Sequence, residues 1–394
     1  MSANSALSRP PLLITGNYWV FTLIDGALRM LVLLQFYQLG YSPLDIALLF
    51  LLYEFSGVLT NLVGDRFGAK LGLNRAMKIG SGLQLVALAM LLVPASALTV
   101  AWVMAAQALS GIARDLYRAS GKSAVTRRVP THLLKGVGYA LGGGLLTLWG
   151  FHSAVMVMLL VLALVWLGSL FLSAQDQRRS EAKPALRNVF SRSFAVNALS
   201  AARLCQFGAR DVWFAVALPV HLASAYDWNY VQVSGFLALW IIACGSVQAL
   251  APGLIDRKRQ RPPDGRSAMR WAGLLAMVPA FIAASPGADP FPGTAGFAGL
   301  PLPELCLIGG LLLFCFLFAI NLSLHSAVVL EHASRDGVSL DVGVYRMANA
   351  GGRLLGVILS GWLYQTEGLG ACLIASSVLL LSAAALSLVL PRHE

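Results

Sequence analysis

Apolar runs of about twenty residues recur from one end of this chain to the other, and they constrain its fold more than any other feature. Lipid offers the backbone no hydrogen-bond partners, so such runs predict transmembrane α-helices. Charged residues make up 12% of the 394 residues, whereas soluble domains carry about 25%. We therefore expect an all-α polytopic membrane protein with twelve spans. These spans cover residues 13–38, 43–63, 76–96, 98–118, 133–151, 153–173, 196–222, 229–253, 268–285, 303–327, 340–363 and 370–390.

Positive charge is distributed unevenly between the loops that join these spans. Lysine and arginine recur in every second loop and are absent from the loops between. The loops without them cover residues 39–42, 97, 152, 223–228, 286–302 and 364–369. The positive-inside rule then places both termini and the 174–195 loop in the cytoplasm, and we expect a multi-pass protein of a bacterial inner (plasma) membrane. The net charge of +11 reflects this topology rather than nucleic-acid binding.

The 174–195 loop is the one long polar connector, and it divides six spans from six. We expect an N-terminal six-helix bundle over 1–173, a cytoplasmic linker over 174–195 and a C-terminal six-helix bundle over 196–394. The halves echo each other, since Asp25 lies in the first span of one and Asp211 in the first span of the other. Paired halves are typical of transporters that bind substrate between the repeats near the membrane midplane.

A charged turn ends the second span of each half, and we expect it to act as a conformational clasp between cytoplasmic helix ends. The clasp residues are Asp65, Arg66, Asp256 and Arg257. The stretch 64–70 reads GDRFGAK and is similar to a loop signature of the major facilitator superfamily, from which Asn61 and Ala69 depart. The alternative is an ordinary basic cytoplasmic turn.

Four spans carry arginine on a polar helical face, because the polar residues recur every three or four positions. They are Asp25 and Arg29 in span one; Gln107, Ser110, Arg114, Asp115 and Arg118 in span four; Arg203, Gln206, Arg210 and Asp211 in span seven; and Arg346, Asn349 and Arg353 in span eleven. Guanidinium groups bind oxyanions bidentately and keep their proton. Spans one, four and seven line the central cavity of that superfamily and span eleven borders it, so the stripes predict a site for a multiply anionic substrate.

Each of these arginines also has a structural interpretation. Pairing with Asp25, Glu54, Asp115 or Asp211 would compensate its charge within the membrane. Arg118 and Arg203 lie near span ends, where a long side chain reaches the cytoplasmic interface. The sequence leaves both interpretations open, and it leaves Asp25 as the expected partner of Arg29.

Four acidic residues inside the spans are candidates for proton coupling. They are Asp25, Glu54, Asp115 and Asp211. Glu54 has no basic neighbour in the sequence and is the leading candidate, whereas Asp211 beside Arg210 is equally well explained as a permanent ion pair.

Other chemistries find little support in the sequence. The five cysteines are scattered without a C-x-x-C pair, so we expect neither a disulfide nor a zinc site. No nucleophile–base or metal constellation is present, so we expect no enzyme and no cofactor. His325, with Asn321 one turn earlier, either faces the cavity or is a hydrogen-bonded packing residue.

Stretches of the first 140 residues resemble the organoarsenical efflux permease family ArsJ. They include YW at 18–19, DGALRMLVLL at 25–34, LGYSP at 39–43, LLYEF at 51–55, TNLVG at 60–64, QALSGIA at 107–113 and KGVG at 135–138. In the second half, YR at 345–346 and GGR at 351–353 are also similar. The DGALR block is the most specific of these.

The resemblance implies proton-coupled export of 1-arseno-3-phosphoglycerate by alternating access, which gives arsenate resistance. The functional partner would be a glyceraldehyde-3-phosphate dehydrogenase that makes this ester. Independently, pentavalent arsenate is a hard oxyanion that suits arginine, whereas trivalent arsenic needs clustered thiolates. The expected substrate-binding residues are Arg29, Arg114, Arg118, Arg210, Tyr345, Arg346, Asn349 and Arg353. The alternative is a general organophosphate or organic-anion antiporter of the same fold, and we expect a monomer in either case.

Overall fold

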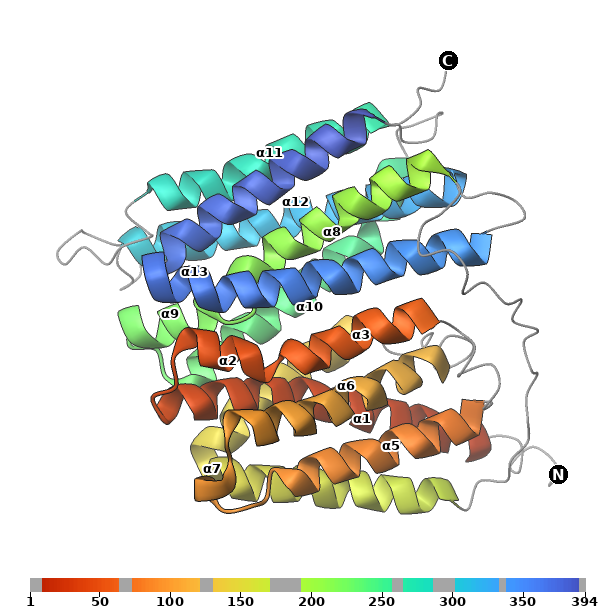
Figure 1. Ribbon diagram of the computed structural model, residues 1–394, viewed down its shortest axis with the longest axis vertical. Coiled ribbons are helices and arrows are strands. Elements are labelled where there is room, and N and C mark those ends of the chain that lie inside the picture. The colour runs from red at the N-terminus through yellow and green to blue at the C-terminus, as the bar shows by residue number, and fades with distance from the viewer. Residues whose placement is uncertain are drawn as a thin grey trace.

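The computed structural model describes residues 9–63, 73–120, 130–170, 193–256, 265–285, 302–332 and 338–389, and the regular structure in these ranges is helical (Figure 1). The first half contains α1 (Arg9–Gln38), α2 (Pro43–Leu49), α3 (Leu51–Val63), α5 (Leu73–Met90), the short η1 (Ala95–Ala97), α6 (Val100–Ser120) and α7 (Thr131–Leu170). The second half contains α8 (Phe194–Phe214), α9 (Ala217–Ala225), α10 (Tyr230–Asp256), α11 (Gly265–Ala284), α12 (Leu302–His332) and α13 (Val338–Leu388).

Two of these helices each contain a pair of predicted spans. Gly150 in α7 has φ 73° and Gly368 in α13 has φ 78°, and the path of the chain changes at both. Glycine adopts positive φ without the steric cost that a Cβ would add. Figure 1 shows α13 folding back on itself. Spans five and six, and spans eleven and twelve, therefore meet at these glycines.

Two other predicted spans are interrupted. The span at 43–63 breaks at Phe50 between α2 and α3. The span at 196–222 breaks between α8 and α9, where Val216 and Ala217 direct their backbone N–H groups to Ser360 Oγ at 3.2 Å and 3.0 Å. The serine of α13 therefore satisfies donors that the broken helix leaves without intrahelical acceptors.

Seven of the described helices are long and apolar enough to cross a membrane. The two that turn at glycine each contain two of the predicted spans, and the more polar α5, α6 and α8 contain three others. The described residues thus accommodate the twelve predicted spans, and the all-α polytopic fold is confirmed. In Figure 1 the start of α1 and the end of α13 lie on the same side, as an even number of crossings requires.

The helices form two groups, with α1 to α7 below α8 to α13 in Figure 1. Corresponding helices cross closely in each group, because glycines leave room for the opposite backbone. A Cβ added at Gly26 of α1 would lie 3.0 Å from the carbonyl oxygen of Lys135 in α7, and one at Gly208 of α8 would lie 3.4 Å from that of Gly352 in α13. In each group, therefore, the first helix crosses closely the helix that turns at glycine, α1 with α7 and α8 with α13.

The groups meet mainly in two places. The first half of α7 packs against α10, and α13 packs against α2 and α3. A Cβ at Gly136 would lie 2.8 Å from the Ala238 carbonyl oxygen, and one at Gly361 would lie 2.6 Å from that of Pro43. The second contact brings Arg353 of α13 opposite Glu54 of α3.

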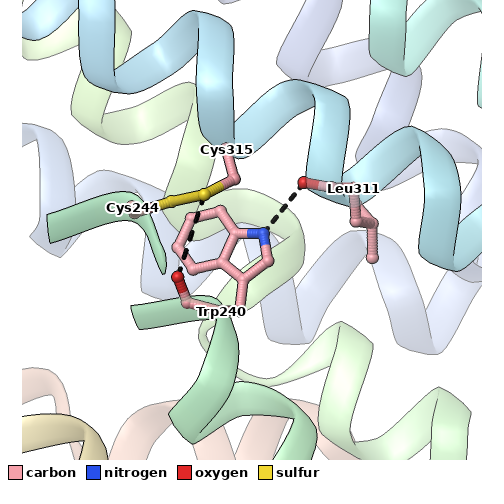
Figure 2. Close-up of a disulfide and its surroundings, with 4 residues drawn as sticks. All are labelled: Trp240, Cys244, Leu311 and Cys315. Atoms are coloured by element: carbon pink, nitrogen blue, oxygen red, sulfur yellow. Dashed lines mark hydrogen bonds between the residues drawn. A yellow bond between two sulfur atoms is a disulfide. The ribbon is translucent and has the colours of Figure 1, made fainter. Parts of the chain in front are cut away.

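The structure corrects the expectation for the cysteines. Figure 2 shows Cys244 of α10 joined to Cys315 of α12 by a disulfide, with their Cα atoms 5.2 Å apart. Trp240 Nε1 donates to the Leu311 carbonyl oxygen at 2.9 Å beside it. The expectation of no disulfide is wrong because 71 residues separate the two cysteines, so no short motif reveals a pair that helix packing brings together.

Candidate functional site

Glu54 of α3 is fully buried and forms ion pairs with arginines from three other helices. Its Oε1 accepts a hydrogen bond from Arg29 Nη1 of α1 at 2.7 Å. Its Oε2 lies 3.3 Å from Arg353 Nη2 of α13 and 3.8 Å from Arg114 Nη1 of α6. We call these four residues the Glu54 cluster. It contains side chains from both helix groups, and its three guanidinium groups surround one carboxylate.

Tyr53 supports this cluster on one side. Its ring lies 4.0 Å from the Arg114 guanidinium carbon and 5.7 Å from that of Arg29, in cation–π contact. Its hydroxyl donates to Asp25 Oδ1 at 2.7 Å, and its carbonyl oxygen accepts from Arg114 Nη2 at 3.2 Å. The expected pairing of Asp25 with Arg29 is therefore wrong, because Arg29 reaches Glu54 on the neighbouring helix instead.

A second acid holds Arg114 from the other side. Asp115 Oδ1 lies 3.2 Å from Arg114 Nε, and its Oδ2 accepts a hydrogen bond from Thr60 Oγ1 at 2.7 Å. Gly57 leaves the space that these groups need, since a Cβ there would lie 2.9 Å from Arg114 Nη2 and 3.5 Å from Arg353 Nη2. Asp115 is therefore ion-paired with Arg114.

Arg210 and Asp211 of α8 form a local pair, with Nη2 and Oδ1 2.6 Å apart. Three aromatic rings enclose the guanidinium. Its carbon lies 5.0 Å from the Phe207 ring centre, 5.9 Å from that of Phe214 and 5.8 Å from that of Phe318. The Arg210 side chain keeps 21% of its surface exposed, so it remains accessible to a ligand.

Arg203 of α8 is a buried residue that the sequence did not single out for binding. Its Nε donates to Asn349 Oδ1 at 2.8 Å and its Nη1 donates to the Leu322 carbonyl oxygen at 3.2 Å. Its guanidinium carbon lies 4.8 Å from the Tyr345 ring centre. In the described part of the chain, no carboxylate lies within 4.0 Å of it. Arg203 does not extend to the cytoplasmic interface, because the residue is only 5% exposed. The sequence feature that could have identified it is its i, i+7 spacing to Arg210, which places both on one helical face.

The remaining predicted residues have different placements. Tyr345 is buried beneath Arg203, and Arg346 is exposed two turns before Arg353 on α13. The side chains of Arg118, Asp65, Arg66, Asp256 and Arg257 lie outside the described residues, so the clasp stays a prediction. Within the described ranges, no group of three or more His, Cys, Asp or Glu side chains is arranged to hold a metal ion.

The described inner arginines outnumber the inner acids. Arg29, Arg114, Arg203, Arg210 and Arg353 face Asp25, Glu54, Asp115 and Asp211. Fixed guanidinium forks with excess positive charge are suited to phosphate-like oxyanions.

No family model matches this chain, and no curated protein matches it. Solved structures do match. A POT family transporter in complex with a thioalcohol-conjugated peptide aligns with a TM-score of 0.69 at 12% identity, covering 96% of this chain and 95% of the other. A mutant of the nucleoside transporter NupG aligns with a TM-score of 0.64 at 15% identity, covering 95% of this chain and 97% of the other. The human organic anion transporter MFSD10 aligns with a TM-score of 0.58 at 19% identity, covering 96% of this chain and 100% of the other.

These matches run over nearly the whole length of each partner, and all three proteins are transporters by name. At such low identity they establish architecture, which agrees with the helix order and paired halves described above. The chain therefore has the all-helical architecture of these three transporters.

Proposed function

We propose that this protein is a secondary active efflux transporter that exports 1-arseno-3-phosphoglycerate and so gives arsenate resistance. The observation that carries the proposal is the convergence of Arg29, Arg114 and Arg353 on the single carboxylate of Glu54. A carboxylate held by three guanidinium groups occupies the position that an oxyanion of a substrate would take.

Competition between Glu54 and the substrate supplies a mechanism. Leaving one partner of a buried ion pair uncompensated costs about 3–5 kcal/mol, so the arginines release Glu54 readily only to another anion. Protonation of Glu54 removes its charge and favours the same exchange. The two events are therefore coupled, and Asp25, Asp115 and Asp211 are further candidates for the proton.

The placement of the arginines on both helix groups supports alternating access. Arg29 and Arg114 belong to the first group and Arg353 to the second. A ligand that replaces Glu54 would touch both groups, so rocking of one against the other would expose it to either side. The proposal also includes the division of the chain into an N-terminal bundle (1–173), a linker (174–195) and a C-terminal bundle (196–394). It places a monomer in a bacterial inner membrane, with both termini in the cytoplasm.

A general organophosphate or organic-anion antiporter is the second candidate. The cationic cluster supports any compact oxyanion, and one structural neighbour is by name an organic anion transporter. The arsenical is favoured by the resemblance of the first five spans to ArsJ, in particular the DGALR block at 25–29.

Arsenic accumulation tests the proposal. Arsenic-sensitive cells that express the protein with a glyceraldehyde-3-phosphate dehydrogenase should retain less arsenic than cells with the dehydrogenase alone. Arg29→Ala, Arg114→Ala and Arg353→Ala should each abolish export at normal membrane levels, whereas Arg270→Ala, an exposed arginine of α11, should export normally. Equal arsenic retention with and without the wild-type protein would refute the arsenical assignment. Wild-type export by all three cluster variants would refute the cationic site.

Proton coupling is tested separately. Inverted membrane vesicles should accumulate the anion when a pH gradient is imposed, and collapse of the gradient with a protonophore should stop the uptake. Uptake that is indifferent to the gradient would exclude protons as the coupling ion.

A further inference from the structure

A second group of polar side chains, all buried except the partly exposed Asn349, lies between α8, α12 and α13 in the C-terminal half. It consists of Arg203 and Gln206 of α8, Asn321 and His325 of α12, and Asn349 of α13, and we call it the Arg203 cluster. Arg203 is 5% exposed, Gln206 and Asn321 are each 1% exposed and His325 is 0% exposed. The cluster is thus an enclosed polar region inside an apolar bundle.

Several atoms of the cluster have no hydrogen-bond partner among the described residues. Gln206 Nε2 donates to Asn321 Oδ1 at 3.0 Å, but Gln206 Oε1 and Asn321 Nδ2 are left over. Both ring nitrogens of His325 are left over as well. Unsatisfied buried polar groups destabilise a fold, so their accumulation at one place needs a reason.

The charge of Arg203 is a second, independent indication that the cluster binds a ligand. The other inner arginines each contact a carboxylate, whereas Arg203 binds an amide and a carbonyl oxygen. A guanidinium has five N–H donors, and those two contacts leave donors for another acceptor. A buried positive charge without an opposite charge calls for an anion.

One helical turn connects this cluster with the Glu54 cluster. Asn349 of α13 holds Arg203, and Arg353, four residues later on the same helical face, lies against Glu54. Four residues of α-helix rise about 6 Å. A short molecule with an anionic group at each end matches this separation.

We propose that the Arg203 cluster is a second substrate subsite, which binds the far end of an organic anion whose first end is bound by Arg29, Arg114 and Arg353. Arg203 and Asn321 Nδ2 donate to the second anionic group. Gln206 Oε1 and His325 accept from a hydroxyl on the connecting carbon chain. The ligand class is therefore a hydroxylated three-carbon compound with two anionic ends.

This inference rests on the proposed function, because it assumes that the Glu54 cluster binds the first anionic end. It adds the discrimination between substrates with two anionic ends and those with one. Inorganic phosphate and arsenate fill only the Glu54 cluster, whereas a three-carbon phosphorylated acid fills both.

The experiment compares 3-phosphoglycerate with inorganic phosphate as stabilising ligands of the purified full-length protein, by thermal shift. Wild type should respond to 3-phosphoglycerate at a concentration at least about tenfold lower than to phosphate, because charge-assisted hydrogen bonds are worth this much or more. Arg203→Gln should remove most of that preference and leave the phosphate response unchanged. Arg270→Ala should behave as wild type.

His325→Leu is the second variant, in case Arg203→Gln does not fold. It should reduce the preference for 3-phosphoglycerate over 3-phosphopropionate, which lacks the hydroxyl, and leave phosphate binding intact. The inference is overturned if Arg203→Gln and His325→Leu keep the wild-type preferences, or if they lose both responses equally through lower stability alone.

Failure of the proposed function would look different. If 3-phosphoglycerate binding depends on Arg203 but cells show no arsenic export, the subsite stands and the arsenical assignment falls. If arsenic export is normal in Arg203→Gln and His325→Leu, the assignment stands and the subsite falls.

Discussion

Arg353 of α13 and Glu54 of α3 form an ion pair, with 3.3 Å between Nη2 and Oε2, that joins the two helix groups within the membrane. The carboxylate is fully buried, and two further arginines of the first group share it. The pair therefore links the charge of the candidate site to the contact between the halves.

Glu54→Gln should destabilise the ligand-free protein by about 3–5 kcal/mol, since it leaves three guanidinium groups without their shared carboxylate. Added arsenate or phosphate should recover more of the melting temperature in this variant than in wild type. Glu367→Gln, at an exposed position, serves as the control. A variant that melts like wild type and ignores both anions would contradict the role given to Glu54.

Gly57→Ala should weaken anion binding without unfolding the protein. The new Cβ would lie 2.9 Å from Arg114 Nη2 and 3.5 Å from Arg353 Nη2, and it would displace both flexible guanidinium groups. We expect about a tenfold loss of transport affinity, equivalent to about 1.4 kcal/mol, measured as the KM in vesicles. Gly168→Ala, where a Cβ meets nothing within 4 Å, should leave the KM unchanged.

Gly352→Ala should destabilise the C-terminal group by about 1–3 kcal/mol through overpacking. A Cβ at this position would overlap the Leu204 carbonyl oxygen and lie 3.1 Å from the Gly208 backbone nitrogen. At the neighbouring Gly351 it would make an ordinary 3.5 Å contact with Leu204, so Gly351→Ala is the matched control. Identical melting temperatures for the two variants would argue against the close crossing of α8 and α13.

Ser360→Ala should cost about 1–3 kcal/mol, because the buried N–H groups of Val216 and Ala217 would lose their acceptor. Thermal melting in detergent measures the loss. Ser382→Ala removes a hydroxyl that is exposed and bonds within its own helix, and it should be nearly neutral.

Thiol counting tests the disulfide. Three cysteines are free and two are joined, so alkylation of the denatured protein should add three groups without a reductant and five with it, by intact mass. Cys244→Ser should leave Cys315 reactive without a reductant. Five adducts on unreduced wild-type protein would contradict the Cys244–Cys315 bond.

The sequence by itself determined the class of fold, because hydrophobic length and loop charge are properties of each segment alone. The twelve expected spans and the repeat of Asp25 and Asp211 both depend on local composition. The arginine stripes were also visible, since helical spacing alone places Arg346, Asn349 and Arg353 on one face.

Only the tertiary structure decided which charges meet. Glu54 had no basic neighbour in the sequence, yet helices α1, α6 and α13 bring three arginines to it. Asp25 bonds Tyr53 rather than Arg29, and Arg203 was left without a carboxylate among the described residues. The packing of α10 against α12 likewise brings Cys244 to Cys315. The physical reason is that ion pairs and disulfides form over a few ångströms, and helix packing alone sets those distances between residues far apart in the chain.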